Sequence, residues 1–461
     1  MELTPLTALS PLDGRYATKV SELRFTMSEL GLMRYRLLIE IRWLIALAHA
    51  TEMKEVKSLD KATQQKLEAL ISNFSFKDAE HIKKIEQTTQ HDLKAVEYFI
   101  QEKFQADASL SHFIPFIHFA CTSEDINNLA YSLMLNEARQ THLLPALHQI
   151  ITILTAFAHQ YADTPMLAKT HGQAASPTTL GKELANFVAR LQQQYTHFKS
   201  IKLMGKFNGA VGNFSAHYAA YPQVDWPTLS QQLINELGLE YNPYTTQIEP
   251  HDQLAHWLQT LVRINTILID FNRDIWGYIS LGYFTQKAVK GEVGSSTMPH
   301  KINPIDFENS EGNLGVANAL ANHLANKLPI SRWQRDLTDS TVLRNLGSIC
   351  GYSLVAYKGI LSGLSKISAN ATAIQKDLES HWEVLAEAIQ TVMRRYGVTD
   401  SYEQLKEFTR GKSIDAHAIQ AFIATLSIPE AAKKQLQSLT PENYLGYAKQ
   451  LAKKIGKEPW D

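Results

Sequence analysis

The chain contains 461 residues, with 45 lysines and arginines against 46 aspartates and glutamates, so its formal net charge is −1. This balance argues against binding of nucleic acid or a membrane surface through bulk electrostatics. Two cysteines, Cys121 and Cys350, are too few for a disulfide framework, and no signal peptide or membrane-length apolar run is visible. We therefore expect a reduced, cytoplasmic protein of about two to four domains.

Helical periodicity of the apolar residues extends along almost the whole chain. Between His251 and Trp276 there is no glycine or proline, and apolar residues recur every three or four positions. Similar stretches cover residues 182–204, 317–328 and 352–367. Alternating strand-like runs joined by hairpin turns are scarce. The sequence therefore predicts an all-α protein built around a bundle of long helices.

Three helical domains are predicted from the breaks in this pattern. They are an N-terminal domain at 1–111, a central long-helix bundle at 112–364 and a C-terminal domain at 365–461. The central helices carry apolar residues on more than one face, as in the stretch from Ile264 to Phe271, and such a helix must be buried on all sides. Burial within one subunit and burial against other copies are both possible explanations, and we favour the second.

Two polar turns lie in the first predicted domain. The segment SPLDGRY places Arg15 and Tyr16 after an Asp-Gly turn, a common arrangement that carries no function by itself. The segment TTQHD places His91 and Asp92 between two helical stretches, where such a pair is usually a local cap.

The segment CTSEDINN, residues 121–128, precedes the first helix of the central bundle. Thr122 or Ser123 is placed to cap that helix, with Asp125 in its first turn. A helix N-terminus that carries hydroxyl groups is also a site for anions. The segment alone does not decide between a cap and a binding site.

Further along, the segment THGQAASP holds His171 in a polar patch that leads into a helix near Thr178. A histidine in this setting is more often a structural hydrogen-bonding residue, although its imidazole can exchange a proton near neutral pH. The segment YTTQIEPHD contains Gln247 and, taken alone, is a helix entry with Pro250 near the first turn.

The most informative segment is GSSTMPHKINP at residues 294–304. Its two prolines, five positions apart, prevent a continuous helix and predict a loop. The loop gathers the hydroxyls of Ser295 and Ser296, the charge of Lys301 and the amide of Asn303. This combination suits a substrate that has carboxylates and a proton to be removed beside them, although a generic loop of this kind is usually a surface turn.

A last polar stretch, SRWQRDLTDSTVLR at residues 331–344, contains Arg335, Ser340 and Arg344. It is either a charged helix entry or a cluster around a phosphate, whose oxygens match the arginine fork. Neither a dinucleotide-binding glycine motif nor a P-loop is present, and the cysteines and histidines lack zinc spacing. We therefore predict no metal site.

The segment at 294–304 resembles the signature of the fumarase/aspartase superfamily. The other polar segments resemble, in the same order and over essentially the whole chain, those of the bacterial-type adenylosuccinate lyases. Two positions depart from the usual pattern, since Gln90 replaces an asparagine and Ala174 a proline. The segment at 331–344 favours a nucleotide substrate over the alternative, another fumarate-releasing lyase such as an argininosuccinate lyase or a fumarase. A non-catalytic helical assembly protein is a further alternative.

The resemblance implies β-elimination of fumarate from adenylosuccinate and from SAICAR in purine biosynthesis, by a homotetramer that shares its active sites between subunits and needs no cofactor. It implies that Ser295 is the base and His171 the acid. It also implies substrate contacts at Arg15, Tyr16, Gln90, His91, Asp92, Thr122, Ser123, Gln247, Ser296, Lys301, Asn303, Asn309, Arg335, Ser340 and Arg344.

Overall fold

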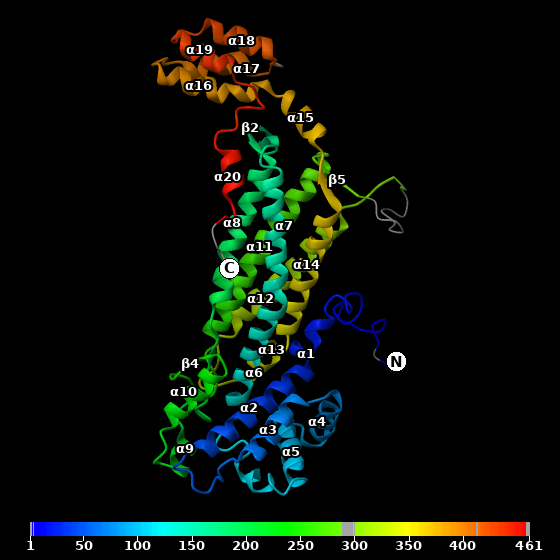
Figure 1. Cartoon of the computed structure of the whole chain (residues 1–461), viewed down its shortest axis with the longest axis vertical. Coiled ribbons are helices and arrows are strands. Elements are labelled where there is room, and N and C mark those ends of the chain that lie inside the picture. Colours follow the sequence, from blue (N-terminus) through cyan, green and yellow to red (C-terminus); the bar gives the residue numbers. More distant parts are fainter. Residues whose placement is uncertain (1, 3, 288–297, 299, 412–413, 458–461) are drawn as a thin grey trace. The chain divides into compact units, whose positions relative to one another are not determined.

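The computed structural model describes residues 2, 4–287, 298, 300–411 and 414–457. In these ranges the chain is mostly helical with a few short strands, which confirms the predicted all-α class (Figure 1). The chain divides into two compact units, each built from three separate segments. The first unit comprises Met1–Ala146, His197–Thr266 and Gly312–Lys358, and the second comprises Leu147–Thr196, Ile267–Glu311 and Gly359–Asp461. The domain boundaries expected at residues 111 and 364 stay a prediction.

The first unit contains helices of varied length together with two very short strands. Its complete elements are η1 (Ser21–Leu23), α1 (Arg24–Met27), α2 (Glu29–His49), α3 (Lys61–Ser72), α4 (Phe76–Thr89), α5 (Asp92–Gln105), η2 (Ser111–Phe116), α6 (Ser123–Ala138), the π-helical turn η3 (Arg139–Leu143), β3 (Met204–Gly205), α9 (Ser215–Ala220), α10 (Trp226–Glu236), β4 (Glu240–Tyr241) and α13 (Thr338–Leu343). Strands β3 and β4 pair in parallel.

Five long helices contribute residues to both units. They are α7 (Leu144–Gln160), α8 (Leu180–Ser200), α11 (Asp252–Ser280), α12 (Ile305–Lys327) and α14 (Leu346–Lys366). The helices expected at 182–204, 251–276, 317–328 and 352–367 correspond to α8, α11, α12 and α14. Periodicity placed all four correctly, and the ends differ by a few residues except at α12, which begins well before residue 317.

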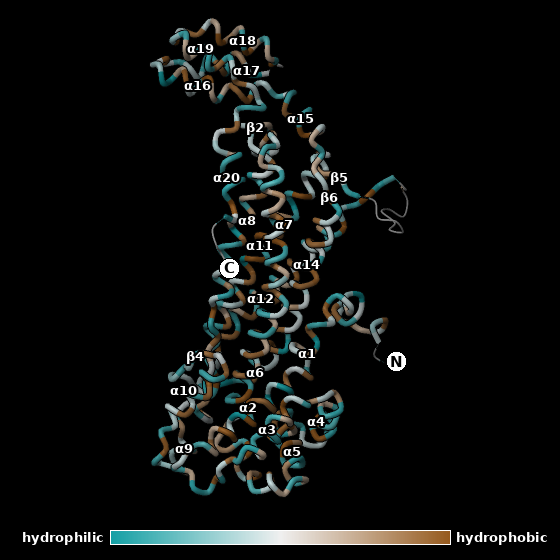
Figure 2. The backbone as a smooth tube through the Cα atoms, viewed as in Figure 1, coloured by the Kyte–Doolittle hydropathy of each residue, from teal (hydrophilic) through white to brown (hydrophobic). Residues whose placement is uncertain are grey.

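Helix α2 shows how the sequence forms these elements. Ser28 caps its start by accepting a hydrogen bond from the backbone N–H of Gly31 at 3.3 Å. Its apolar residues Ile39, Trp43 and Leu47 recur every four positions and are completely buried. Brown and teal stretches recur along the helices in Figure 2, as expected for helices with one buried face.

Helix α11 is only partly buried within the single chain. Inside the stretch from Ile264 to Phe271, Leu268 is completely buried but Thr266 and Asp270 are exposed. The apolar Ile264 and Phe271 are also buried within one copy of the chain, and the two exposed positions are polar, so the choice between the two explanations stays open.

The second unit carries an antiparallel hairpin and a C-terminal group of small helices. The hairpin pairs β1 (Pro165–Thr170) with β2 (Gln173–Thr179), and a second antiparallel pair joins β5 (Phe284–Gln286) to β6 (Ile367–Ala369). The remaining helices are α15 (Ala371–Glu379), η4 (Trp382–Leu385), α16 (Ala386–Arg395), α17 (Ser401–Thr409), α18 (Ala416–Thr425), α19 (Glu430–Gln437) and α20 (Ala448–Lys454). A core that includes Ile389, Ile419 and Leu436 holds α16, α18 and α19 together.

One helical stretch, Ser123–Gln160, is long and apolar enough to cross a membrane by length and composition, with a hydropathy of 1.3. This differs from the expectation that no such run exists. The core helix of a soluble protein has the same length and composition, and 44% of the most apolar part of this stretch is buried inside the protein. The absence of a membrane partner stays a prediction.

Candidate functional site

The first part of the site is the start of helix α6. Thr122 occupies the N-cap position, and its backbone N–H donates to the carboxylate of Asp125 at 2.8 Å. This confirms the capping role expected for the segment at 121–128. The cap fixes the backbone of Thr122 and Ser123, the two residues predicted to bind a substrate carboxylate, at the positive end of the helix dipole.

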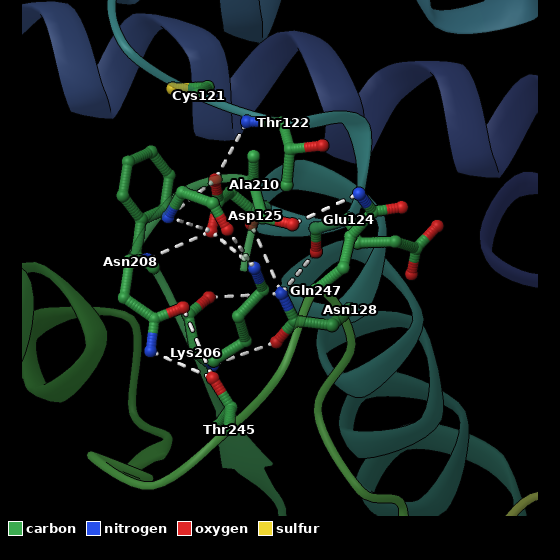
Figure 3. A network of polar contacts seen from close by, with 12 residues as sticks. Cys121, Thr122, Glu124, Asp125, Asn128, Lys206, Asn208, Ala210, Thr245 and Gln247 are labelled. Atoms are coloured by element: carbon green, nitrogen blue, oxygen red, sulfur yellow. Dashed lines mark hydrogen bonds and ion pairs between the residues drawn. The ribbon is translucent and has the colours of Figure 1, made fainter. Parts of the chain in front are cut away.

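The carboxylate of Asp125 also forms an ion pair inside the protein. The ammonium group of Lys206 lies 2.9 Å from this carboxylate, and both side chains have no exposed surface (Figure 3). The backbone N–H groups of Asn208 and Gly209 donate to the same carboxylate at 2.9 and 3.2 Å. Lys206 in turn donates to the carbonyl of Gly209 at 3.0 Å. Because each charge has hydrogen-bonding partners, the pair ties the segment after β3 firmly to α6.

Amide side chains extend this network on either side of the ion pair. Asn128 exchanges two hydrogen bonds with the backbone of Lys206, one from its side-chain nitrogen at 3.0 Å and one to its oxygen at 2.9 Å. Asn208 donates to the hydroxyl of Thr245 at 2.8 Å, and Gln247 donates to the carbonyl of Ala210 at 3.0 Å. The loop that carries Gln247 is thereby fixed beside the ion pair (Figure 3).

Arg335 contacts two other predicted site residues, Gln247 and Ser340. Its guanidinium donates to the side-chain oxygen of Gln247 at 3.4 Å and to the hydroxyl of Ser340 at 2.8 Å. It also lies 3.1 Å from the carboxylate of Glu124 and 3.5 Å from that of Asp339, both of which are buried. The guanidinium predicted for a phosphate site is therefore present at Arg335, and it is paired with the carboxylates of Glu124 and Asp339.

Glu124 connects Arg335 to the rest of the cluster. Burial raises the pKa of its carboxyl, and the charge of Arg335 and a hydrogen bond from Asn127 oppose this increase only in part. Asn127 accepts a hydrogen bond from Arg36 at 2.9 Å, and Arg36 donates to Asp92 at 2.8 Å. The predicted residue Asp92 thus joins the same chain of polar contacts as Arg335.

Asp92 forms ion pairs with two arginines, Arg36 and Arg344. Burial favours a raised pKa for its carboxyl, but the charge of Arg36, a hydrogen bond from that residue and the charge of Arg344 outweigh burial and lower the pKa to about 2. The guanidinium of Arg344 lies 3.3 Å from Asp92 and 3.2 Å from Glu29. Asp92 is consequently ionised at neutral pH and holds Arg344 in place.

Arg344 also lines a cavity of about 320 Å³ beside the N-terminal turn. Asp13, Arg24 and Glu29 line the same cavity, and Asp13 forms an ion pair with Arg24 at 3.1 Å. Arg15 is exposed and Tyr16 is half-buried, and neither is among the residues that line this cavity.

His91 is the N-cap of α5, where its Nδ1 accepts from the backbone N–H of Lys94 at 3.2 Å. This confirms the local cap expected for the pair of His91 and Asp92. Gln90 adopts a left-handed conformation, with φ of 54°, at the end of α4 and donates to the carbonyl of Gln87 at 2.8 Å.

In the second unit, His171 lies at the tip of the hairpin and not in an irregular loop. Thr170 pairs with Gln173, so His171 and Gly172 form a two-residue turn, and their φ values of 52° and 75° are typical of a type I′ turn. The imidazole is exposed. Lys169 lies 3.1 Å from Asp377 of α15 and thereby fixes the base of the turn.

The remaining predicted residues also belong to the second unit. Lys301 is exposed, whereas Asn303 and Asn309 are half-buried on either side of the start of α12. The carbonyl of the intervening Ile302 accepts from the side chain of Gln286 on β5 at 2.8 Å. Ser295 and Ser296 lie outside the described residues.

The sequence alone did not identify four of the residues that build this site: Glu124, Asp125 as an ion-pair partner, Lys206 and Asp339. One signal was available, because Lys206 interrupts an otherwise apolar run, and a lysine in that position needs a partner. Among the described residues, no group of three or more His, Cys, Asp or Glu side chains is placed to hold a metal ion.

Known proteins share both the sequence and the fold of this chain. A family model described as Lyase matches residues 14–319, and one described as Adenylosuccinate lyase C-terminal matches residues 331–445. The chain is 55% identical over 456 residues to adenylosuccinate lyase of Vibrio cholerae, covering 99% of this chain and 100% of that protein. It is 55% identical over 448 residues to the adenylosuccinate lyase of Escherichia coli K12, covering 97% of this chain and 98% of that protein.

Two solved structures share the fold at low sequence identity. Fumarate lyase from Mesorhizobium sp. BNC1 has a TM-score of 0.74 at 18% identity, over 94% of this chain and 97% of that one. The 3-carboxy-cis,cis-muconate lactonizing enzyme from Pseudomonas putida has a TM-score of 0.72 at 20% identity, over 94% of this chain and 95% of that one. From the sequence matches along nearly its full length, the chain is a carbon–nitrogen lyase and belongs to the adenylosuccinate lyase family of the fumarase/aspartase superfamily.

Proposed function

We propose that this chain cleaves adenylosuccinate to AMP and fumarate, and SAICAR to AICAR and fumarate. The observation that carries the proposal is the 55% identity, over nearly the full length, to proteins named adenylosuccinate lyase. The cluster of Arg335, Ser340 and Gln247 supports a phosphorylated substrate, because a guanidinium fork and a hydroxyl suit the oxygens of a phosphate.

The reaction is a β-elimination. The ionised hydroxyl of Ser295 takes a proton from the carbon next to a succinyl carboxylate and becomes a neutral hydroxyl, and the negative charge left on that carbon spreads into the carboxylate. Lys301, Asn303 and Ser296 stabilise this charge. The electron pair on that carbon then forms the carbon–carbon double bond of fumarate as the carbon–nitrogen bond breaks. The electron pair of the broken bond stays with the nitrogen, and His171 supplies the proton that the nitrogen takes up.

The type I′ turn supports this role for His171. A two-residue turn with both residues at positive φ holds its first side chain outward from a hairpin whose strands are fixed by backbone hydrogen bonds. An imidazole presented in this way is accessible to a substrate, and histidine is the side chain that most often acts as a general acid or base in enzymes.

The phosphate end of the substrate lies with Arg335, Ser340 and Arg344 in this proposal, with Arg15 and Tyr16 as further contacts. Binding at this end positions the succinyl group without taking part in the chemistry. Gln90, His91, Asp92, Thr122, Ser123, Gln247 and Asn309 complete the substrate contacts.

We further propose that the enzyme is a homotetramer whose active sites are shared between subunits, and that it acts in the cytoplasm. Helix α12 supports this assembly because Val316 is 45% exposed, and Gly312 and Gly315 have no atoms within 4 Å of where a Cβ would lie. Light scattering measures the mass of the assembly, which should be that of four copies of the chain. Mixing the inactive variants Ser295→Ala and His171→Ala should restore some activity if sites are shared, whereas failure to do so would contradict sharing.

The proposed reaction is tested by ultraviolet-monitored turnover of the purified protein with adenylosuccinate. Fumarate hydration and argininosuccinate cleavage are measured beside it. Cleavage of adenylosuccinate alone supports the proposal. Activity on only fumarate or argininosuccinate would support the lyase chemistry but contradict a nucleotide substrate. In that case AMP should not inhibit the activity.

A further inference from the structure

The segment that leads into the start of α6 has an unusual backbone. His118 and Ala120 adopt φ values of 55° and 59°, a left-handed conformation that is uncommon outside glycine. Such a conformation persists only where surrounding contacts enforce it, and it is concentrated at functional sites. The segment ends at Thr122, the N-cap of α6.

His118 lies between two carboxylates from different helices. Its Nδ1 is 2.6 Å from Glu40 on α2, and its Nε2 is 3.8 Å from Glu97 on α5. Glu40 is 2% exposed and Glu97 is 5% exposed. Lys94 neutralises part of this charge because its ammonium lies 2.6 Å from Glu97. A doubly protonated imidazole donates to Glu40 and places its second N–H, and its positive charge, toward Glu97.

The pKa of His118 follows from this arrangement. Burial acts to lower it, but the charges of Glu40 and Glu97 and the hydrogen bond to Glu40 outweigh burial and raise it. The imidazole is therefore a cation over a wider pH range than a free histidine, and it balances two buried negative charges.

Helix α2 holds the same segment at a second point. The indole of Trp43, one turn after Glu40, donates to the carbonyl of Phe119 at 3.0 Å. On the far side, Asp125 accepts from the N–H of Thr122. The backbone between His118 and Thr122 is thus anchored at both ends, and the imidazole is one of the two anchors before Thr122.

We propose that His118 is a positioning residue that places Thr122 and Ser123 for the succinyl carboxylate of the substrate. The inference rests on the proposed function, because it assigns those two residues to the succinyl half. Loss of the anchor lets Thr122 and Ser123 shift, and small shifts of a positioning group weaken binding in the geometry that reacts. AMP lacks the succinyl group, so its binding is unaffected.

The test compares two variants with one control. His118→Asn keeps a hydrogen-bond donor that can reach Glu40 but removes the positive charge. His118→Leu removes both the donor and the charge. His112→Asn is the control, because His112 belongs to the preceding element η2 and its ring packs on Phe113. The KM for adenylosuccinate and the inhibition constant for AMP are measured for each, with circular dichroism to check folding.

We expect the KM for adenylosuccinate to rise on the order of 10-fold in His118→Asn and further in His118→Leu, since hydrogen bonds to charged groups are lost. The inhibition constant for AMP should stay within about twofold, and the control should match the wild type in both measurements. A parallel rise in both constants would show a general structural role, and no change in either would show no role; each result overturns the proposal. Failure of the proposed function is a different result, because the wild-type protein itself would then not cleave adenylosuccinate.

Discussion

Replacing Lys206 by methionine tests whether the buried ion pair holds the site together. The substitution keeps a side chain of similar length but leaves the carboxylate of Asp125 buried without its counter-charge. Removing one partner of a buried pair typically costs about 3–5 kcal/mol. Three backbone N–H groups, those of Thr122, Asn208 and Gly209, still donate to the carboxylate. We therefore expect the free energy of unfolding to fall by about 3 kcal/mol, at the lower end of that range.

The chain offers a matched control four residues earlier. Lys202 forms an ion pair with Glu240 at 3.4 Å, but these side chains are 70% and 50% exposed. Lys202→Met should change stability by less than about 0.5 kcal/mol, because water screens such a pair. Urea unfolding followed by circular dichroism, at one fixed protein concentration, compares the two variants. Equal losses for the two lysines, or a loss below about 1 kcal/mol for Lys206→Met, would refute the reasoning.

Three further predictions concern the reaction and the charged cluster. Ser295→Ala should lower kcat on the order of 10²–10⁴ with substrate binding kept, and an unchanged kcat would remove the serine from the role of base. Arg335→Lys should raise KM about 10-fold because the fork that reaches Gln247 and Ser340 is lost, and an unaltered KM would place Arg335 outside the phosphate site. Asp92 has a lowered pKa of about 2 against an ordinary value of 3.8, so its ionised form stabilises the fold above pH 3.8, and this stability is lost as the pH falls toward 2. Asp92→Asn should accordingly cost about 1–2 kcal/mol at pH 7, after allowance for partial solvent exposure, and a smaller amount at pH 2.5; a difference that does not depend on pH would contradict this.

Much of the helical framework was predictable from the sequence, because a long amphipathic helix carries its periodicity over many residues. The stretch from His251 to Trp276 is found in α11, Asp252–Ser280. The hairpin around His171 was not predicted. Its β2 strand, QAASPTT, is mostly small and polar, and the turn begins with a histidine where glycine or asparagine is usual. A short hairpin in a helical protein leaves little periodic signal.

For the site, features that depend on neighbouring residues were predictable and features that depend on distant ones were not. The cap at Thr122 and the cap at His91 follow from side chains that reach backbone groups three residues away. The pairs of Asp125 with Lys206 and of Glu124 with Arg335 join segments far apart in the chain. No local pattern specifies such a partner, although a buried charge signals that one must exist.

Two of the arginines predicted to bind phosphate, Arg335 and Arg344, are each paired with two carboxylates in this structure. For Arg335, whose side chain is 18% exposed, the physical reason is that burying a guanidinium without a counter-charge is strongly unfavourable. The side chain of Arg344 is 49% exposed, so its carboxylates chiefly fix its position. Arg335 has Glu124 and Asp339, and Arg344 has Glu29 and Asp92. Because a guanidinium has five N–H donors, such pairing fixes its orientation without using its whole capacity to donate. The same carboxylates connect segments that the sequence leaves apart, so the residues that keep the cations in position also assemble this part of the site.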